Sequence, residues 1–472
     1  MPENTAKIGI IGLAVMGSNF ARNLAGKGIP TAVYNRTTKV TKKFLTDFGN
    51  EQLIGSETLE KFVASLEKPH KIILLVKSGE AVDSVIKSLL PLLDKKDIII
   101  DFGNSHFTDT ERRASMLEKH NIHFWGCGIS GGEKGALQGP SLMPGGPKES
   151  WPEIRNILET AAAKDFSGTP CVTYLGPGSA GNYTKMVHNG IEYGIMQLLA
   201  EAYEILSKVS ALQPPQIAQI FKDYNRGKLN GFLIELVGTV LKKKDELDSG
   251  YLIDKVLDEA AQKGTGTWTA IDALEKGIAT PTISAAVNSR IISGEKTVRE
   301  KLAQIYNPEQ KTITPKDTDK LANSIENALY AGIICSFAQG FDLIQKTSTQ
   351  NQWNTNPAEV ARIWQGGCII RTVLLQTIEQ SFKNAGTDKR SILEMPEISS
   401  ILKDNIVDLQ NIVQIAHENQ IPVPAFSSTL DYLHAMTQKR SSANLIQALR
   451  DSFGAHTYKR INKEGPFHSE WQ

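Results

Sequence analysis

Apolar and polar positions along the chain follow two different patterns, which meet near residue 178. Before that point, short apolar runs alternate with stretches of helical periodicity, such as residues 81–93. This alternation is typical of a parallel sheet with helices packed on it. It predicts a Rossmann-like, doubly wound α/β domain over residues 1–178. The strands are expected at residues 7–12, 31–34, 71–76, 98–101 and 123–125, with a last strand at residues 171–175.

From Ser179 onward the pattern is almost wholly helical, and it contains an internal repeat with a constant offset of 138 residues. Packing residues keep the same register in both copies, and five residues are inserted before the last matches. The pattern predicts a large all-α domain over residues 179–437, built from a duplicated unit. The matched residues include Asn189 with Asn327, Gly194 with Gly332, Ile195 with Ile333, Ala200 with Ala338 and Pro214 with Pro357.

Residues 438–472 differ in character from both domains. They begin with a short amphipathic helix, predicted at residues 443–449, and continue into an aromatic end that bears glycine and proline. The segment has too little apolar surface to form a core of its own. We therefore predict an extended C-terminal tail that is either disordered or docked elsewhere, and its aromatic residues favour docking.

One stretch of the first helical unit gathers polar residues on a single face. They recur at i, i+3, i+4 and i+7: Lys185, His188, Asn189 and Glu192. Lysine and glutamate are almost never fully buried without a partner or a function. A polar seam between packed helices is the alternative, because structural networks also bury charges. The second copy has Asn323 and Tyr330 at the positions of the lysine and the glutamate, so the scaffold alone does not require the charged pair.

The first apolar run ends in a turn of the form G-x-A-x-x-G, which opens a helical stretch and consists of Gly12, Leu13, Ala14, Val15, Met16 and Gly17. Gly12 permits the tight turn, the small Ala14 lets a pyrophosphate approach the backbone, and Gly17 allows close packing of helix on strand. The helix N-terminus then faces the phosphates. The turn predicts a dinucleotide site.

The second predicted strand ends in Asn35-Arg36-Thr37, without a carboxylate. Enzymes that select NAD usually place an acidic residue here for the ribose 2′-hydroxyl, whereas an arginine can bind a 2′-phosphate. A surface arginine in a turn is the alternative, but the fingerprint favours NADP. Ligands in such sheets bind at the carboxyl ends of strands. This adds three turns to the candidates: Val76-Lys77-Ser78, the turn around Asn104, and Ser130-Gly131-Gly132.

Composition narrows the possible partners and the compartment. A net charge of +1 leaves no global basic field, which argues against nucleic acid or a membrane surface as a partner. No apolar run approaches the length needed to span a bilayer. The four cysteines are scattered and include no C-x-x-C, so free buried thiols are expected, without zinc or disulfides. A reducing, cytoplasmic location is predicted.

These motifs together resemble the 6-phosphogluconate dehydrogenase family over essentially the whole chain. The resemblance implies oxidative decarboxylation of 6-phosphogluconate to ribulose 5-phosphate, with reduction of NADP and without a metal. It also implies a homodimer whose tail reaches into the partner's active site. The motifs that carry it are residues 12–17, 35–37, 130–132, 185–193 and 450–458, and the turn at Lys263.

The resemblance also implies roles for single residues. Lys185 would be the general base and Glu192 the general acid. NADP would contact residues 12–17, 35–37 and 76–78 and Asn104. One departure is Thr267, where many relatives have a second lysine; it bears on phosphate binding and leaves the catalytic set intact. The sugar acid would be held by Asn104, Ser130, Gly131, Gly132, His188, Asn189 and Tyr193, and its phosphate end by Lys263, Thr265, Arg290, Arg450 and His456.

The chemistry suits these residue types, and two other functions compete with it. A lysine whose pKa is lowered can accept a hydroxyl proton, and a buried carboxylic acid can protonate an enediol. A β-hydroxyacid dehydrogenase that oxidises without decarboxylating would not need Glu192, the duplicated half or the cationic tail. A catalytically silent NADP-binding sensor or scaffold would not need Lys185, Asn189 and Glu192. Release of carbon dioxide separates all three hypotheses.

Overall fold

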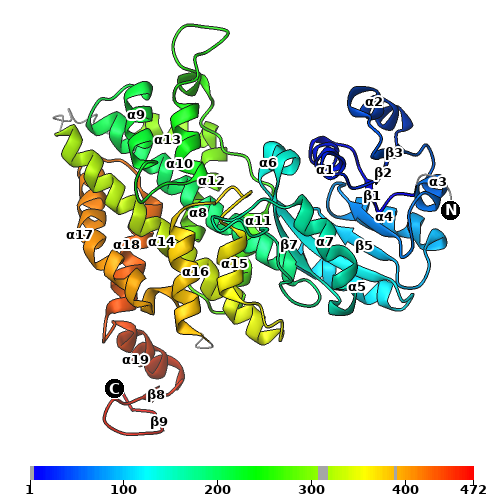
Figure 1. Ribbon diagram of the computed structural model, residues 1–472. Helices are drawn as coiled ribbons and strands as arrows, with labels where there is room; N and C mark the ends of the chain where they lie inside the picture. Colours follow the sequence, from blue (N-terminus) through cyan, green and yellow to red (C-terminus); the bar gives the residue numbers. More distant parts are fainter. Residues whose placement is uncertain (1–4, 307–316, 387–390, 472) are drawn as a thin grey trace.

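The protein is described here by a computed structural model that covers residues 5–306, 317–386 and 391–471. The ends of the predicted first and third segments, residues 1–4 and 472, lie outside these ranges. Figure 1 shows a sheet domain beside a larger helical domain, from which the C-terminal segment protrudes. The predicted order of an α/β domain followed by an all-helical domain is confirmed.

Seven strands form the sheet in the order β3-β2-β1-β4-β5-β6-β7. The first six are parallel, and β7 pairs antiparallel with β6. Strand residues such as Ile8, Ile73 and Ile99 are fully buried, because the sheet is packed on both faces. The strands are β1 (Ile8–Ile11), β2 (Thr31–Tyr34), β3 (Leu53–Gly55), β4 (Lys71–Leu74), β5 (Ile98–Asp101), β6 (His123–Ser130) and β7 (Ser141–Gly145).

Helices pack against the sheet through two separate apolar clusters. One cluster joins the sheet to α1 (Val15–Gly26) and α7 (Trp151–Ala161), and the other joins it to α4 (Glu80–Leu89) and α5 (Phe107–Glu118). The remaining elements of this domain are α2 (Thr38–Phe48), α3 (Leu59–Ala64), α6 (Gly132–Gln138) and the 3-10 turns η1 (Leu90–Leu92) and η2 (Lys148–Ser150).

The prediction for the last strand of the sheet is wrong. Residues 171–175 form no strand, and Val172 makes only an isolated bridge to Leu142. The last strand is β7, whose end contains the pair Pro144-Gly145. Proline is tolerated in an edge strand because a missing backbone donor costs nothing there, and β7 lies at the edge of the sheet.

Strand β6 is longer than the predicted residues 123–125. The prediction ended too early because glycines interrupt the apolar pattern of the strand. These glycines are required by the helix that packs on the strand. A Cβ at Gly126 would lie 1.8 Å from Oδ1 of Asn182, and a Cβ at Gly128 would lie 2.3 Å from Cβ of Lys185. The strand thus carries the backbone close to the predicted polar face.

Two long helices, α8 (Ala180–Val209) and α14 (Thr318–Gln350), pack together at the centre of the helical domain. Their first residues are separated by the 138-residue offset of the predicted repeat. The next helix in each copy, α9 (Pro214–Tyr224) or α15 (Pro357–Ile363), begins with proline. The other elements are α10 (Phe232–Val240), η3 (Leu252–Lys255), α11 (Thr265–Glu275), α12 (Pro281–Gly294), α13 (Lys296–Tyr306), α16 (Leu374–Ala385), η4 (Ile392–Glu394), α17 (Pro396–Glu418) and α18 (Pro424–Thr437).

The tail is folded locally and does not lie on the body of its own chain (Figure 1). Helix α19 (Ala443–Gly454) is longer than the predicted residues 443–449, and β8 (Tyr458–Lys459) pairs with β9 (Pro466–Phe467). Within the single chain the tail is therefore ordered, and the expectation that it docks elsewhere stays a prediction. The aromatic side chains of the tail pack on one another, and the centre of the Tyr458 ring lies 5.9 Å from that of Trp471.

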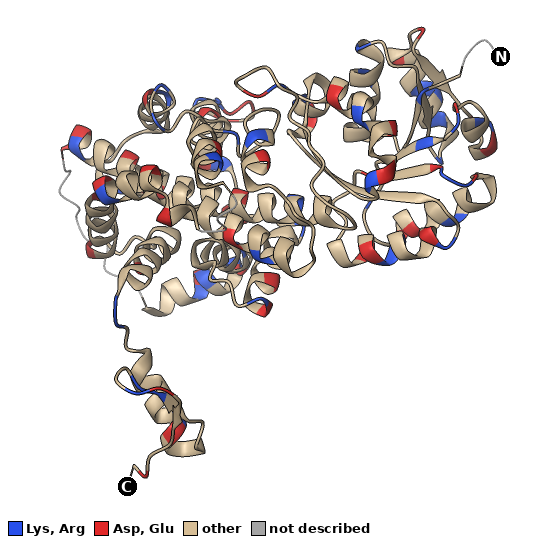
Figure 2. Ribbon diagram, turned by 60° about the horizontal axis from the view of Figure 1, so that its bottom comes forward, with Lys and Arg blue, Asp and Glu red and all other residues tan. Residues whose placement is uncertain are grey.

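Figure 2 shows basic and acidic residues interspersed along the ribbon of both domains, as the near-zero net charge leads one to expect. Of the helices in the described ranges, none combines the length and the apolar character needed to cross a membrane.

Candidate active site

The predicted polar face lies in the buried N-terminal half of α8, where the helix packs on β6, α11 and α14. Gly190 permits the close approach of α11, because a Cβ there would lie 2.6 Å from Cγ2 of Thr269. The Thr269 hydroxyl donates to the backbone oxygen of Met186 at 2.9 Å and fixes this contact. Lys185 is consequently enclosed, with only 7% of its surface exposed.

The polar side chains form one hydrogen-bonded network that joins three elements. Lys185 Nζ donates to Asn189 Oδ1 at 2.5 Å, and the amide nitrogen of Asn189 donates to Thr265 Oγ1 at 3.2 Å. His188 Nδ1 lies 3.1 Å from Asn189 Oδ1, and its Nε2 lies 3.2 Å from Ser130 Oγ. A neutral imidazole satisfies both contacts if Nδ1 donates and Nε2 accepts. The lysine is therefore held by side chains of α8, which groups from β6 and α11 hold in turn.

Burial shifts the pKa values of the three titratable groups of the network, Lys185, His188 and Glu192. It lowers the pKa of Lys185, although Glu192 opposes the shift, and it lowers the pKa of His188 well below its usual value, aided by Lys185. Burial raises the pKa of Glu192, against the opposing charges of Lys185 and Arg290. A lysine with a lowered pKa and a glutamate with a raised pKa can serve as a base and an acid in the same site.

The loop after β6 borders the network and contains Gly131 and Gly132. Both have positive φ angles, 123° and 61°, which favour glycine. A Cβ at Gly131 would also lie 2.6 Å from the backbone oxygen of Gly367. The two glycines therefore follow Ser130 in a conformation that only residues without a side chain adopt easily.

Asn104 lies in the turn after β5, which a buried carboxylate organises. Asp101 accepts from the Ser105 hydroxyl at 2.6 Å and from the backbone N–H of Gly103 at 2.8 Å. Arg113, which is fully buried, donates to the Ser105 hydroxyl at 3.1 Å. The residues on both sides of Asn104 are thus fixed, and its own side chain is left exposed at the carboxyl end of the strand.

The predicted phosphate-binding residues fall into two groups. Tyr193 is one turn beyond Asn189 on α8, and the Arg290 guanidinium lies 3.5 Å from the centre of its ring. Lys263 is exposed, two residues before Thr265, in the turn that opens α11. These four residues adjoin the network within one chain.

The other predicted phosphate ligands, Arg450 and His456, are not brought to this site in the single chain. Both are exposed on the protruding tail, where Arg450 donates to the Gln447 side chain at 3.2 Å. In Figure 1 the tail extends from the helical domain, away from α8 and α11.

A loop of the second helical copy also reaches the site, and sequence reasoning missed it. The backbone N–H of Ile369 donates to Ser130 Oγ at 3.3 Å. The Trp364 ring meets His188 edge to face, with 5.5 Å between the ring centres. The Gly366-Gly367 pair was the available signal, because adjacent glycines between two helical stretches indicate a close backbone approach.

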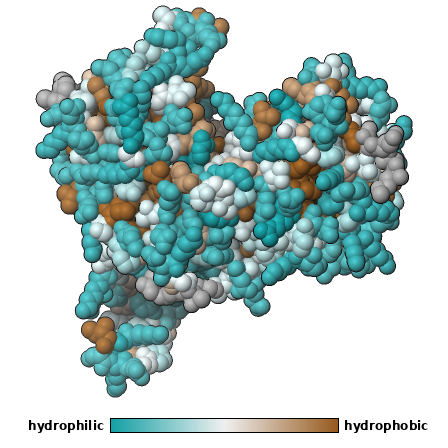
Figure 3. Space-filling view, viewed as in Figure 1, coloured by the Kyte–Doolittle hydropathy of each residue, from teal (hydrophilic) through white to brown (hydrophobic). Residues whose placement is uncertain are grey.

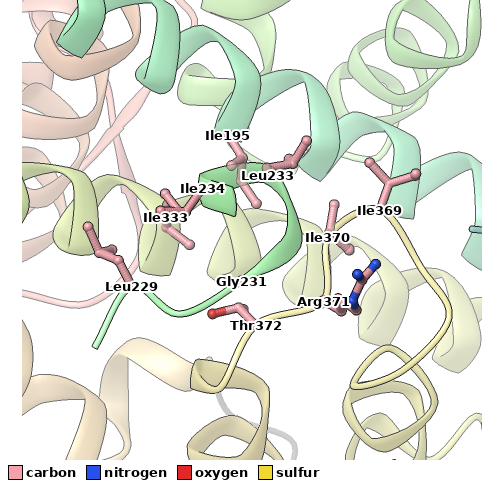
Figure 4. A pocket seen from close by; sticks show the side chains of 10 residues that line it. All are labelled: Ile195, Leu229, Gly231, Leu233, Ile234, Ile333, Ile369, Ile370, Arg371 and Thr372. Atoms are coloured by element: carbon pink, nitrogen blue, oxygen red, sulfur yellow. The ribbon is translucent and has the colours of Figure 1, made fainter. Parts of the chain in front are cut away.

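A small apolar cavity beside this loop is not the ligand site. Figure 4 shows it between the two copies, with the repeat partners Ile195 and Ile333 on its wall. Its volume of ≈ 20 Å³ is far below the roughly 300 Å³ at which ligand pockets begin.

The predicted dinucleotide turn borders a larger cavity of ≈ 550 Å³ at the carboxyl ends of β1, β2 and β4. Its wall includes seven of the predicted cofactor residues: Gly12, Ala14, Asn35, Arg36, Thr37, Val76 and Lys77. Ala14 precedes α1 without a side-chain cap, so the first turn of the helix offers backbone N–H groups to a phosphate. Arg36 is exposed, and in the described part of the chain it has no ion pair.

The other predicted cofactor residues support this cavity or flank it. The backbone N–H of Leu13 donates to Asn35 Oδ1 at 3.2 Å and ties the first turn to the second. Gly17 is buried beneath the turn, where a Cβ would lie 1.9 Å from the backbone oxygen of Gly12. Val15 is exposed, Met16 is half-buried, and Ser78 is exposed in the turn after β4. The residues present therefore suit a dinucleotide with a 2′-phosphate.

Comparison with known proteins covers both domains. The NAD binding domain of 6-phosphogluconate dehydrogenase matches residues 7–176, and the C-terminal domain of 6-phosphogluconate dehydrogenase matches residues 181–471. The chain is 44% identical to the NADP(+)-dependent, decarboxylating 6-phosphogluconate dehydrogenase of Bacillus subtilis (strain 168), over 98% of this chain and 99% of the relative. It is 46% identical to the decarboxylating 6-phosphogluconate dehydrogenase of Synechococcus elongatus, with the same coverage of both chains.

A solved structure is similar over the same length. Plasmodium falciparum 6-phosphogluconate dehydrogenase has been solved in its apo form, with its cofactor NADP+ and with its substrate 6-phosphogluconate. It is 42% identical to this chain and has a TM-score of 0.94, over 98% of this chain and 100% of the other.

Proposed function

The chain belongs to the 6-phosphogluconate dehydrogenase family, and from that premise we propose how its own residues carry out the reaction. The protein is an NADP-dependent oxidoreductase that oxidises and decarboxylates 6-phosphogluconate. The products are ribulose 5-phosphate, carbon dioxide and NADPH. The observation that carries the assignment of roles is the buried face of α8, where the pKa of Lys185 is lowered and that of Glu192 is raised.

The cavity at the strand ends would hold NADP. The turn at residues 12–17 would receive the pyrophosphate, and Asn35, Arg36 and Thr37 the 2′-phosphate. Val76, Lys77, Ser78 and Asn104 would flank the nicotinamide half, because they follow the neighbouring strands β4 and β5. When bound, the cofactor supplies the hydride acceptor.

Lys185 acts as base and then as acid. As C3 of the substrate becomes a ketone, neutral Lys185 takes the proton of the 3-hydroxyl group. The β-keto acid then loses carbon dioxide from C1, and the ammonium of Lys185 returns the proton to the ketone oxygen. Asn189 supports both steps, because its oxygen accepts from Lys185 while its amide is anchored on Thr265.

Glu192 completes the reaction. Loss of carbon dioxide leaves an enediol, which needs a proton on its first carbon, from the face opposite Lys185. Glu192, whose pKa is raised by burial, supplies that proton, and Lys185 takes back the enol proton as the ketone forms. The sugar hydroxyls and carboxylate would contact Asn104, His188, Asn189 and the loop at residues 130–132. Lys263, Thr265, Arg290 and Tyr193 would face the phosphate end.

The direct test of this function is the pair of products formed by the purified protein. With 6-phosphogluconate and NADP, we expect one carbon dioxide for each NADPH. NADPH without carbon dioxide would instead indicate the β-hydroxyacid dehydrogenase, and neither product would indicate the silent NADP-binding protein.

Arg36 is expected to select the cofactor. Arg36→Ala should raise the Michaelis constant for NADP far more than that for NAD, because only NADP carries the 2′-phosphate. One charge-assisted contact contributes about 1.5–3 kcal/mol, or roughly 10- to 150-fold in affinity. Arg155→Ala is the matched control, because this exposed arginine pairs with Glu159 on α7. Equal losses with both cofactors would show that Arg36 is not the selector.

We further propose three functional segments and a homodimer. Residues 1–178 would bind NADP, residues 179–437 would carry the catalytic face, and residues 438–472 would dock on the partner subunit. Apolar residues of α19 support the docking, since Ile446 and Phe453 are 61% and 75% exposed in the single chain. Figure 3 shows an apolar patch on the tail. The four cysteines are buried free thiols, which supports a reducing, cytoplasmic location.

Complementation tests the crossing tail. A Lys185→Ala chain lacks the base but has an intact tail, and an Arg450→Ala, His456→Ala chain has the base but a defective tail. Neither homodimer should work well. A mixed dimer should recover about half of the wild-type activity, because one of its two sites combines an intact body with an intact tail from the other chain. Two different affinity tags would isolate that mixed dimer. A mixed dimer as inactive as its parents would mean that each site is built from one chain.

A further inference from the structure

The tail contains one buried carboxylate, that of Asp451, in a segment whose other residues are mostly exposed. Its side chain is fully buried and accepts four hydrogen bonds. Oδ1 accepts from the backbone N–H of Thr457 at 2.9 Å and from His468 Nδ1 at 3.0 Å. Oδ2 accepts from the backbone N–H of Ser469 at 3.1 Å and from Trp471 Nε1 at 2.8 Å. Asp451 thus joins α19 to the chain on both sides of the β8–β9 hairpin.

The backbone beside this carboxylate is strained. Ala455 and Thr457 have φ angles of 49° and 57°, so both residues that flank His456 lie in the left-handed region. For a β-branched residue such as threonine this conformation is an outlier, and it persists only where the surroundings enforce it. Two hydrogen bonds to Asp451 do so: Ala455 N donates to its backbone oxygen at 2.9 Å, and Thr457 N donates to its carboxylate.

The two strained residues and the carboxylate fix the places of the predicted phosphate ligands. Arg450 immediately precedes Asp451, and His456 immediately precedes Thr457. The hydrogen bond between Asp451 and Thr457 therefore sets the spacing of Arg450 and His456 directly. Gln447 strengthens the same arrangement, because it donates to the backbone oxygen of Thr457 and accepts from Arg450.

We propose that Asp451 is a positioning residue that presents Arg450 and His456 to the substrate phosphate as a preformed pair, before the tail docks. This inference rests on the proposed function, in which the tail supplies those two side chains. The carboxylate does not touch the substrate; it acts by holding the left-handed turn around His456. A preformed pair binds the phosphate without first ordering the turn, which lowers the entropic cost of binding.

The rest of the tail has contacts that do not involve Asp451. Tyr458 and Ser469 pair through their hydroxyl groups at 2.7 Å, and the rings of Tyr458 and Phe467 lie 6.2 Å apart. Strands β8 and β9 pair through their backbones. Replacing the carboxylate should therefore loosen the turn around His456 more than the hairpin.

The test is Asp451→Asn in the full-length protein, with its assembly checked by light scattering. The amide keeps the shape but turns an NH2 group toward donors that the carboxylate accepts from. We expect the Michaelis constant for 6-phosphogluconate to rise by about 10- to 100-fold, because misplaced binding groups lose affinity steeply, with kcat and the constant for NADP little changed. Turnover of gluconate, which lacks the phosphate, should stay at the wild-type level. Trp471→Phe removes one donor to Oδ2, leaves the bond to Thr457, and should behave almost as wild type.

Three further results overturn the inference in distinguishable ways. If Asp451→Asn leaves the constant for 6-phosphogluconate unchanged while Arg450→Ala, His456→Ala raises it, the tail binds phosphate but Asp451 does not position it. If the double variant also leaves that constant unchanged, the tail has no such role in the proposed function. If Asp451→Asn lowers gluconate turnover as much as that of 6-phosphogluconate, or prevents assembly, the carboxylate has only a general structural role. Adding Asp451→Asn to the double variant should have no further effect, because the three residues act as a unit.

Discussion

Replacing Lys185 by alanine is expected to abolish the formation of NADPH from 6-phosphogluconate. The substitution removes the amine whose pKa burial lowers and which we assign to take the 3-hydroxyl proton. General acid–base groups contribute about 10²–10⁴-fold, and a loss at or above the upper end is expected because the same side chain acts in successive steps. The measurement is steady-state turnover, with the unfolding temperature checked in parallel.

Lys185→Arg distinguishes the loss of a proton acceptor from the loss of a positive charge. Arginine keeps a cation in the site but cannot be deprotonated in a protein. It should therefore be nearly as inactive as alanine. Lys208→Ala is the matched control, since Lys208 lies at the far end of the same helix, exposed and paired with Glu204 at 2.6 Å. An arginine variant that keeps a tenth or more of wild-type turnover would contradict a base at this position.

Replacing Glu192 by glutamine is expected to lower turnover by about 10²–10⁴-fold while 6-phosphogluconate still binds. Glutamine has the same shape but no acidic proton, so protonation of the enediol is lost and the earlier oxidation is spared. A rapid-mixing experiment should then show a fast burst of one NADPH per site, followed by slow turnover. The Lys185 variants should show no burst.

The control for this variant is Glu204→Gln on the same helix, where the carboxylate is partly exposed and pairs only with Lys208 among the described residues. It should retain wild-type activity. Near-normal turnover in Glu192→Gln would remove Glu192 from the mechanism, and loss of the burst would move its role to the oxidation step.

The sequence predicted the sheet wherever the apolar runs are uninterrupted. Strands β1, β2, β4 and β5 lie where the runs predicted them, because residues buried on both faces leave a continuous apolar signal. The pattern missed β3, predicted β6 too short, and placed the last strand at residues 171–175 in place of β7. In β6, Gly128 leaves room for the Lys185 side chain, and in β7, Pro144 lies on an edge strand. Tertiary contacts therefore override local propensity in both strands.

The sequence pattern predicted one helical face of the candidate site, and not the contacts of that face with other elements. Helical periodicity was enough to put Lys185, His188, Asn189 and Glu192 on one face of α8. It carries no information on the partners from other elements, such as Ser130 at His188 and Thr265 at Asn189. Both residues were predicted only as ligand contacts, Ser130 from its place at a strand end and Thr265 from the family resemblance. The contact of Ile369 with Ser130 was missed altogether, since it joins residues 239 positions apart.

The tail shows a further limit of local patterns. Its apolar content argued against independent folding, yet the hydrogen bonds of Asp451 give it order without a core. A carboxylate that accepts from both sides of a hairpin has no periodic signature. Under our proposal, Arg450 and His456 reach a substrate only when the tail docks on a second chain.

The measurement that tests the central claim most directly is the deuterium content of ribulose 5-phosphate formed in heavy water. If Lys185 drives decarboxylation and Glu192 protonates the enediol on one face, the product should carry a single deuterium at C1, in one configuration. Nuclear magnetic resonance of the purified product distinguishes the two C1 positions. Equal labelling of both positions would mean that the enediol is protonated free in solution, and the absence of ribulose 5-phosphate would mean that the enzyme oxidises without decarboxylating.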